Sequence, residues 1–354
     1  MQNSINLRGL NVSYTDIKTE GFNILMQALR GSPIERLHCF NCGITSIEIE
    51  SVPPNNLRVL SLVGNNVQSE GFSRLLRSLR DSSIEELYCS NCYIESIEIN
   101  TDLLPGSLKK LSLDWNRINT NGCRGIAKLL QEGDATLQRL SLGNNLIGDE
   151  GVAILVDVLK SNTSLKDLDL DSNHGISDIG RLLILKMLND ISSVKSMLHS
   201  NHTLRSIDLG KEMDGEIESY ISKALRINET YECPKAAGRE KVIQTQLHNK
   251  RRAKLVEIQG VVSQSVYGEI NPPHLPEVLS LVGRRHVQEE LYLALKASIA
   301  ELLSTVNRKL YLQQRRARLA AELAEIDAEL AAIEATEGDV DNGNKSLRKK
   351  RLRL

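Results

Sequence analysis

Two pairs of cysteines have the spacing of a metal or redox site. Cys39 and Cys42 are separated by two residues, as are Cys89 and Cys92. Four thiolates at this spacing bind zinc in many small domains, and a single pair can carry redox chemistry. Whether they do so here depends on the elements that hold them.

The sequence contains no other motif of catalysis. It has no Gly-rich phosphate-binding loop, no His-Glu-x-x-His and no Gly-x-Ser-x-Gly, and its seven histidines are scattered without metal-ligand spacing. We therefore expect no enzyme activity, no cofactor and no small-molecule substrate.

A repeated spacing of apolar residues dominates the first 210 residues. The pattern Leu-x-x-Leu-x-Leu-x-x-Asn/Cys-x-Leu begins at Leu7, Ile34, Leu57, Ile84, Leu108, Leu137, Leu165 and, in degraded form, Leu204. Apolar residues at the fourth and sixth positions alternate with polar ones, which predicts a short strand with one buried face. The ninth-position Asn or Cys is expected to turn the chain and to bond the neighbouring turns.

Two kinds of connection follow these strands. Residues 20–32, 70–82 and 149–162 have apolar residues at helical spacing. The connections at 44–55 and 94–106 are shorter, alternate like an extended convex strand and end at or beside Pro. The two kinds make a super-repeat of roughly 50 residues, and the longer interval between Leu165 and Leu204 predicts an extra helix.

The repeat argues against a zinc site. The two cysteine pairs occupy the sixth and ninth positions, which face inward, two repeats apart. Strands stack about 4.8 Å apart, so the pairs lie roughly 10 Å from each other. Ligands of one zinc must lie within about 4 Å of one another. We expect structural cysteines and no metal.

These repeats resemble those of leucine-rich-repeat proteins, and residues 148–173 resemble the ribonuclease-inhibitor subtype. That subtype is shared by the inhibitor, the Ran GTPase-activating proteins and the sensor halves of many nucleotide-binding immune receptors. The resemblance covers residues 5–210. It implies an α/β fold, a horseshoe-shaped solenoid with parallel strands on the concave face and mostly helices on the convex face.

The charge of the chain separates into two opposed parts. Residues 1–230 hold 23 Lys and Arg against 29 Asp and Glu, whereas residues 231–354 hold 21 against 16, which together give the net charge of −1. We predict a solenoid over 1–230, short helices over 231–283, a long helix over 284–337 and a flexible basic tail over 338–354. The extension after the solenoid is therefore expected to be all α.

A partner is expected on the concave face, which the third, fifth and seventh positions of each strand line and the eighth borders. Rings and carboxylates gather at these positions, and exposed rings with nearby charge are typical of protein-binding surfaces. The predicted partner-binding residues are His38, Phe40, Tyr88, Asp114, Trp115, Asp167, Asp169, Asp171 and Asp208. The carboxylates predict a partner with a basic surface.

The tail allows several interpretations. Leu319, Leu323, Ile326, Leu330 and Ile333 have heptad spacing. This spacing allows three alternatives for residues 284–337. The helix forms a coiled coil and thereby a homo-oligomer, or it packs back on the solenoid, or it is a lone helix held by local ion pairs. The last ten residues carry six cations, which fits a nuclear-import signal, an anchor for lipid or RNA, or a solvated terminus.

The sequence as a whole predicts a non-catalytic protein-interaction module or scaffold. One alternative is a regulator of a small GTPase, although the Ran activators carry an acidic C-terminal region where this chain is basic. A second alternative is a nuclear or nucleic-acid-associated protein that acts through the tail. No apolar run reaches the roughly 18 residues of a membrane span, and the cytoplasm is the expected location, with the nucleus as the alternative.

Overall fold

A computed structural model describes residues 7–47, 54–98, 105–131, 136–210, 215–231, 233–247, 255, 257–259 and 316. The chain divides into two compact units, residues 1–285 and 286–354. The predicted long helix and basic tail lie outside the described residues, apart from Arg316. Within the described part of the chain, no helix is both long and apolar enough to cross a membrane.

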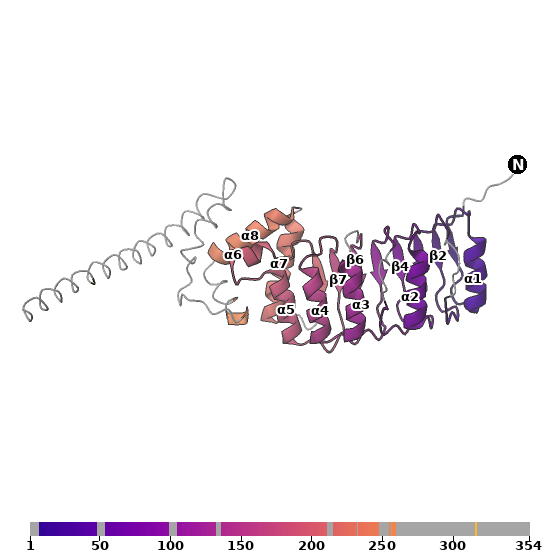
Figure 1. Cartoon of the computed structure of the whole chain (residues 1–354), viewed down its shortest axis with the longest axis horizontal. Helices are drawn as coiled ribbons and strands as arrows, with labels where there is room; N and C mark the ends of the chain where they lie inside the picture. Colours follow the sequence, from indigo (N-terminus) through magenta and orange to yellow (C-terminus); the bar gives the residue numbers. More distant parts are fainter. Residues whose placement is uncertain are drawn as a thin grey trace, which may run out of the picture. The chain divides into compact units, whose positions relative to one another are not determined.

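The described residues form one parallel sheet whose strands follow one another in sequence order (Figure 1). The strands are β1 (Gly9–Asn11), β2 (Arg36–His38), β3 (Val59–Ser61), β4 (Glu86–Tyr88), β5 (Lys110–Ser112), β6 (Arg139–Ser141), β7 (Asp167–Asp169) and β8 (Ser206–Asp208). Each covers the third to fifth positions of one copy of the repeat. The predicted leucine-rich-repeat solenoid is thus confirmed.

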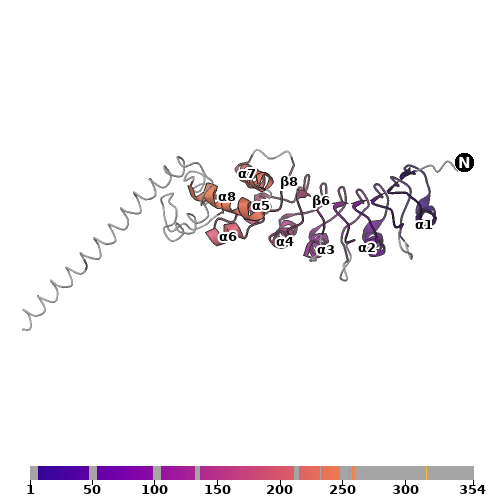
Figure 2. The same ribbon diagram turned by 90° about the horizontal axis from the view of Figure 1, so that it is seen from above.

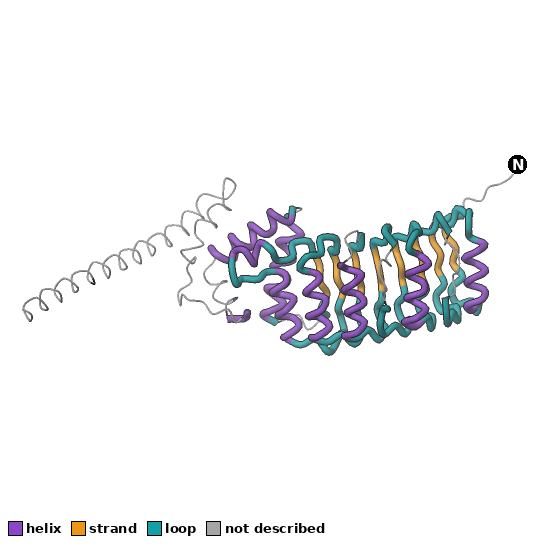
Figure 3. Tube along the Cα trace, in the orientation of Figure 1, coloured by secondary structure: helices purple, strands orange, loops and turns teal. Residues whose placement is uncertain are grey.

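The first five helices lie along one side of this row of strands, as Figures 2 and 3 show. They are α1 (Lys18–Ala28), α2 (Gln68–Leu79), α3 (Thr120–Gln131), α4 (Asp149–Leu159) and α5 (Asp178–Leu188). At the C-terminal end of the row lie α6 (Val194–Leu198), α7 (Glu216–Thr230) and α8 (Pro234–Leu247). The extra helix predicted between Leu165 and Leu204 is present, because α5 and α6 both lie in that interval. We call the other side of the strands the strand face.

The core is a stack of aliphatic side chains between strands and helices. At the fourth positions, Leu37, Leu60, Leu87 and Leu111 are wholly buried. Apolar burial of this kind stabilises by about 25 cal/mol per Å². Because each turn of the solenoid is thin, the same side-chain type recurs at each turn.

Asparagines at the ninth position tie neighbouring turns together. The Asn116 side chain accepts hydrogen bonds from the backbone N–H groups of Cys92 (2.9 Å) and Ile94 (3.0 Å). Its amide donates to the carbonyls of Cys89 and Leu113, each at 2.9 Å. Asn65, Asn145 and Asn173 make equivalent bonds in their own turns.

The cysteine pairs belong to the same set of ninth-position hydrogen bonds between turns, which we call the ladder. Cys39, Cys42, Cys89 and Cys92 are all wholly buried. At the ninth position, Cys42 donates its thiol to the Val12 carbonyl and Cys92 donates to the Leu62 carbonyl, both at 3.2 Å. Burial raises the pKa of Cys39 to about 12, so that this thiol stays protonated and is a poor ligand or nucleophile. Among the described residues, no three His, Cys, Asp or Glu side chains group closely enough to hold a metal.

The two shorter connections differ from the sequence expectation. No strand forms over the described residues 42–47 and 93–98. The backbone N–H groups of Thr45 and Ser46 instead donate to the Thr19 hydroxyl, each at 3.1 Å. The Ser69 hydroxyl does the same for Glu95 and Ser96. Because helix-bearing repeats lie on either side, these segments have no extended neighbour with which to pair.

The described C-terminal helices pack on the last repeats. α7 contacts α5, and α8 contacts both α6 and α7. From α8, the buried Lys241 ammonium donates to the carbonyls of Leu188, the last residue of α5, at 2.6 Å and of Asn201 at 3.0 Å. A cation at a helix C-terminus satisfies carbonyls that lack a partner within the helix. Lys241 therefore fastens α8 to the solenoid.

Candidate protein-binding site

The register of the sheet places the predicted side chains on the strand face. Neighbouring strands pair position by position, so that Tyr88 of β4 lies opposite Ser112, Ser112 opposite Ser141, and Ser141 opposite Asp169. Asp208 completes this row on β8. Side chains at alternate positions of a strand share one face. The fourth positions between them point into the core.

The carboxylates of the C-terminal half come together around Ser141. The Ser141 hydroxyl lies within hydrogen-bond distance of Asp114, and 3.1 Å from Oδ2 of Asp169. Asp114 also accepts from the hydroxyl of Ser112 at 2.8 Å and from the backbone N–H of Gly143 at 2.9 Å. These contacts hold Asp114 and Asp169 on either side of Ser141, two turns of the solenoid apart.

The remaining carboxylates extend this group, which we call the acidic row: Asp114, Asp169, Asp171 and Asp208. Asp169 accepts a hydrogen bond from the backbone N–H of Asp171 at 2.9 Å. Burial raises the pKa of Asp169, and the negative charges of Asp114 and Asp208 raise it further. The acidic row therefore carries charge repulsion that a bound cation would relieve.

A shallow hollow of about 280 Å³ opens beside the acidic row on β5 to β8. Its polar lining consists of Lys110, Arg139, Ser141, Asp167, Asp169, Ser206 and Asp208. The two cations were missing from the predicted site, although both occupy third positions of the repeat. Including cations at those positions, beside the rings and carboxylates, would have found them.

The predicted rings do not form one cluster. His38 and Phe40 contact each other edge to face, with ring centroids 5.5 Å apart. Tyr88 contacts residues of the protein itself. Its hydroxyl donates a hydrogen bond to the Glu86 carboxylate, and the Lys110 ammonium lies 4.8 Å from the centre of its ring. These rings are half-buried. His38 and Phe40 thus lie together at β2, and Tyr88 lies separately on β4.

Trp115 has a different environment. Its side chain is 65% exposed, and its backbone N–H bonds the carbonyl of Gly143 beside the acidic row. Its φ of 56° is left-handed, as at the other eighth positions that the structure describes. Those positions hold Tyr14, Asn41, Gly64, Asn91, Asn144 and Ser172. Left-handed backbone costs a bulky residue roughly 1 kcal/mol, and here the turn of the repeat imposes it.

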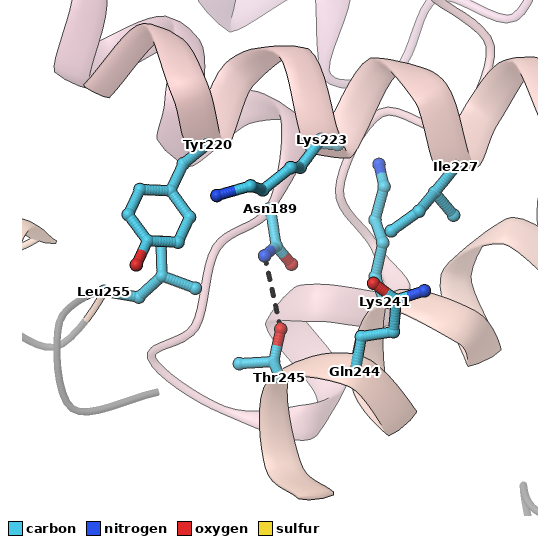
Figure 4. Close-up of a pocket in the computed structure, with 9 residues that line it drawn as sticks. Asn189, Tyr220, Lys223, Ile227, Lys241, Gln244, Thr245 and Leu255 are labelled. Atoms are coloured by element: carbon cyan, nitrogen blue, oxygen red, sulfur yellow. Dashed lines mark hydrogen bonds between the residues drawn. The ribbon is translucent and has the colours of Figure 1, made fainter. Parts of the chain in front are cut away.

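A second cavity lies between α7 and α8 and is too small for a cofactor (Figure 4). Its volume of about 30 Å³ is that of a water molecule. Asn189 reaches toward it and donates to the Thr245 hydroxyl at 3.4 Å, while Lys223 and Tyr220 border it from α7. We assign this cavity to the packing of the C-terminal helices.

Comparisons with known proteins agree with the repeat. The family model described as "Leucine Rich repeat" matches residues 54–76, 107–127, 133–155 and 161–185. A mouse (Mus musculus) protein described as "Ribonuclease inhibitor" is 33% identical over 92 residues, which is 26% of this chain and 20% of that protein. The chain thus aligns with about a fifth of this relative.

A solved structure titled "Leiomodin-1 Actin-Binding Site 2 (ABS2)" aligns with 51% of this chain and 79% of its own. Its sequence identity is 16% and its TM-score is 0.27.

Proposed function

We propose that this leucine-rich-repeat solenoid of the ribonuclease-inhibitor-like kind is a non-catalytic protein-binding module that holds its partner on the strand face. Proteins of this repeat type commonly mediate protein–protein interaction and are typically non-catalytic. The observation that carries the proposal is the pairing of an exposed Trp115 with the crowded acidic row beside it. Anchoring rings and steering charge together are typical of protein interfaces.

The acidic row favours a partner with a basic surface. An ammonium or guanidinium group placed between Asp169 and Asp208 would offset their mutual repulsion, which contributes to the raised pKa of Asp169. Asp114 and Asp169 are already oriented by Ser141, so that binding would require little reordering of these side chains.

Trp115 is the proposed anchor of the interface. Burying an exposed indole removes a large apolar area from water, and truncated interface tryptophans often cost 2 kcal/mol or more of affinity. The substitution should not harm folding, because the side chain contributes little to the core and the left-handed backbone disfavours a bulky residue.

Two variants test the proposal, each with a control on the helix side. The partner is first captured from a lysate of the organism's own cells. Trp115→Ala should lower the affinity for this partner by about 30-fold, since about 2 kcal/mol of binding free energy is lost. Asp169→Ala should lower the affinity by about tenfold, and by less at high salt. Ile179→Ala on α5 removes an equally exposed apolar side chain (65%), and Asp157→Ala on α4 removes an exposed carboxylate.

The captured partner is identified by mass spectrometry, and its affinity is then measured for each purified variant beside the thermal unfolding midpoint. Binding that survives both Trp115→Ala and Asp169→Ala, or that falls equally in the helix-side controls, would contradict the proposal. Loss of binding in step with loss of stability would contradict it as well.

GTPase regulation and nucleic-acid binding stay predictions from the sequence. The second depends on residues 345–354, which lie outside the described part of the chain. Oligomerisation through 284–337 and a cytoplasmic or nuclear location likewise stay predictions.

A further inference from the structure

Exposed apolar side chains recur on three successive turns of the solenoid, at the end where each strand passes into its connection. Tyr93, Trp115 and Leu146 follow β4, β5 and β6, and their exposed fractions are 46%, 65% and 64%. We call these three side chains the apolar rim. Single exposed apolar residues are common on protein surfaces, whereas a group of them marks a binding surface. Whether these three form a group depends on the turns that hold them.

Backbone hydrogen bonds stack the turns that carry the apolar rim. The N–H of Leu146 donates to the carbonyl of Ile118 in the preceding turn at 2.9 Å, and the N–H of Arg117 donates to the carbonyl of Ile94 in the turn before that at 2.8 Å. Turns stacked in this way repeat at about 4.8 Å, so the backbones of Tyr93 and Leu146 lie about 10 Å apart. The third member of the apolar rim lies on the turn between them.

The turns themselves do not need apolar side chains at these positions. Trp115 holds an eighth position of the repeat, and Tyr93 and Leu146 hold tenth positions. Polar or small residues hold the same positions elsewhere: Asn41, Gly64, Asn91, Asn144 and Ser172 at the eighth, and Asp16, Gly43, Asn66, Arg117 and His174 at the tenth. Tyr14 is the exception, and it lies three turns before the apolar rim begins. Because the side chains of the apolar rim are exposed, folding does not explain why they gather on neighbouring turns.

The surroundings of the apolar rim are negatively charged. Asp114 of the acidic row directly precedes Trp115 in the chain. Arg117 lies two residues further on, and its guanidinium is 3.6 Å from the carboxylate of Glu95. Glu95 offsets the charge of Arg117, so that the acidic row sets the potential beside the apolar rim.

We propose that the apolar rim binds an apolar segment of the partner that is flanked by Lys or Arg. The apolar side chains of this segment cover Tyr93, Trp115 and Leu146, and its cations lie over Asp114 and the rest of the acidic row. An apolar centre with charged groups at its edge is typical of protein interfaces, because the edge excludes water from the anchors. This inference rests on the proposed function and adds to it two further residues and the chemistry of the segment that binds.

Two labelled peptides test the inference on the full chain. Both have the same central segment of four apolar residues; the basic probe has two Lys on each side of it, and the acidic probe has two Glu on each side. We expect the basic probe to bind about tenfold more tightly at low salt. The difference should shrink at high salt, because salt screens exposed charges. Fluorescence anisotropy measures both affinities.

Two variants remove members of the apolar rim one at a time. Tyr93→Asn and Leu146→Asn introduce the residue that holds the same position at Asn66, and asparagine tolerates the left-handed backbone of Tyr93 (φ 59°). Each should lower the affinity for the basic probe by about tenfold, since each removes apolar area that binding would bury. Tyr14→Asn is the matched control, because it removes an exposed ring (77%) outside the apolar rim, and it should leave the affinity unchanged. Thermal unfolding confirms that all three variants fold.

Two results with the probes overturn the inference. One is an affinity that is equal for the two probes, or too weak to measure for both. The other is an affinity for the basic probe that neither Tyr93→Asn nor Leu146→Asn changes. Sedimentation of the full chain tests a second copy as the occupant, and an oligomer that the same two variants dissociate overturns the inference as well.

These failures are distinct from failure of the proposed function. If the captured partner needs Trp115 and Asp169 but neither Tyr93 nor Leu146, the strand face binds protein without the apolar rim, and this inference alone fails. If the partner needs neither Trp115 nor Asp169, the proposed function itself fails.

Discussion

Replacing Asn116 with alanine is expected to lower the free energy of unfolding by about 3 kcal/mol, which is the largest effect we predict. The substitution removes the partner of the backbone N–H groups of Cys92 and Ile94 and of the Cys89 carbonyl inside the core. The Leu113 carbonyl keeps a hydrogen bond from the Asn145 amide. Each buried polar group that loses its hydrogen bond costs about 1 kcal/mol or more. Urea unfolding followed by circular dichroism measures the loss.

Two further variants distinguish the loss of the ladder hydrogen bonds from the general effect of replacing an asparagine. Asn66→Ala changes an exposed asparagine two turns away, in the repeat that begins at Leu57, and should cost less than about 0.5 kcal/mol. Asn116→Cys should recover part of the loss, because Cys42 and Cys92 hold the same position in their own repeats and donate to a neighbouring carbonyl. An Asn116→Ala variant as stable as the parent would refute the ladder as a main source of stability.

The second large effect is a dependence of stability on pH that Lys241 produces. Burial lowers the pKa of Lys241 to about 7 from an ordinary value of 10.5. Between these values the unfolded chain binds a proton that the folded chain does not, so stability rises with pH. The rise is at most about 1.4 kcal/mol per pH unit, or about 2 kcal/mol from pH 7 to pH 9.

Lys241→Met removes the titrating group and should remove this rise. Lys223→Met, which changes an exposed lysine on α7, should retain it. The buried thiols of Cys39 and Cys123 have raised pKa values and act in the opposite direction above pH 8, but they act equally in all three proteins. The difference in unfolding free energy between the parent and Lys241→Met isolates the lysine, and parallel pH curves would contradict its role.

The sequence predicts the strands well because their pattern is local. Each strand of the sheet lies in one copy of the repeat, where apolar residues at the first, fourth and sixth positions leave one buried face. The sequence predicts short helices over 231–283 but does not place the start of α8. This helix begins at Pro234, which fits the first turn because it lacks an N–H to satisfy.

The shorter connections were misread because pairing partners are not local. Residues 44–47 alternate as a strand does, yet the N–H groups of Thr45 and Ser46 bond the Thr19 side chain of the preceding repeat. The strand forms only where a neighbour of the same kind lies beside it. The sequence already shows that the two kinds of connection alternate. A shorter connection therefore has a helix-bearing repeat on each side, which predicts that no strand forms there.

The candidate site was predicted in part. The sequence placed Asp114, Asp169 and Asp208 on one face, and the structure brings them to the same hollow or its edge. It did not reveal that Ser141 links Asp114 to Asp169, or that Tyr88 is engaged by Glu86 and Lys110. Those details depend on side-chain contacts across strands, which the repeat pattern does not specify.

The most direct measurement of the central claim is site-specific photo-crosslinking to the captured partner. A photoreactive phenylalanine analogue at position 115 samples the border of the strand face beside the acidic row, and the same group at position 179 samples the helix side; both replace side chains that are 65% exposed. The account predicts a strong crosslink from position 115 and a weak one or none from position 179. A crosslink of equal or greater yield from position 179 would contradict binding on the strand face.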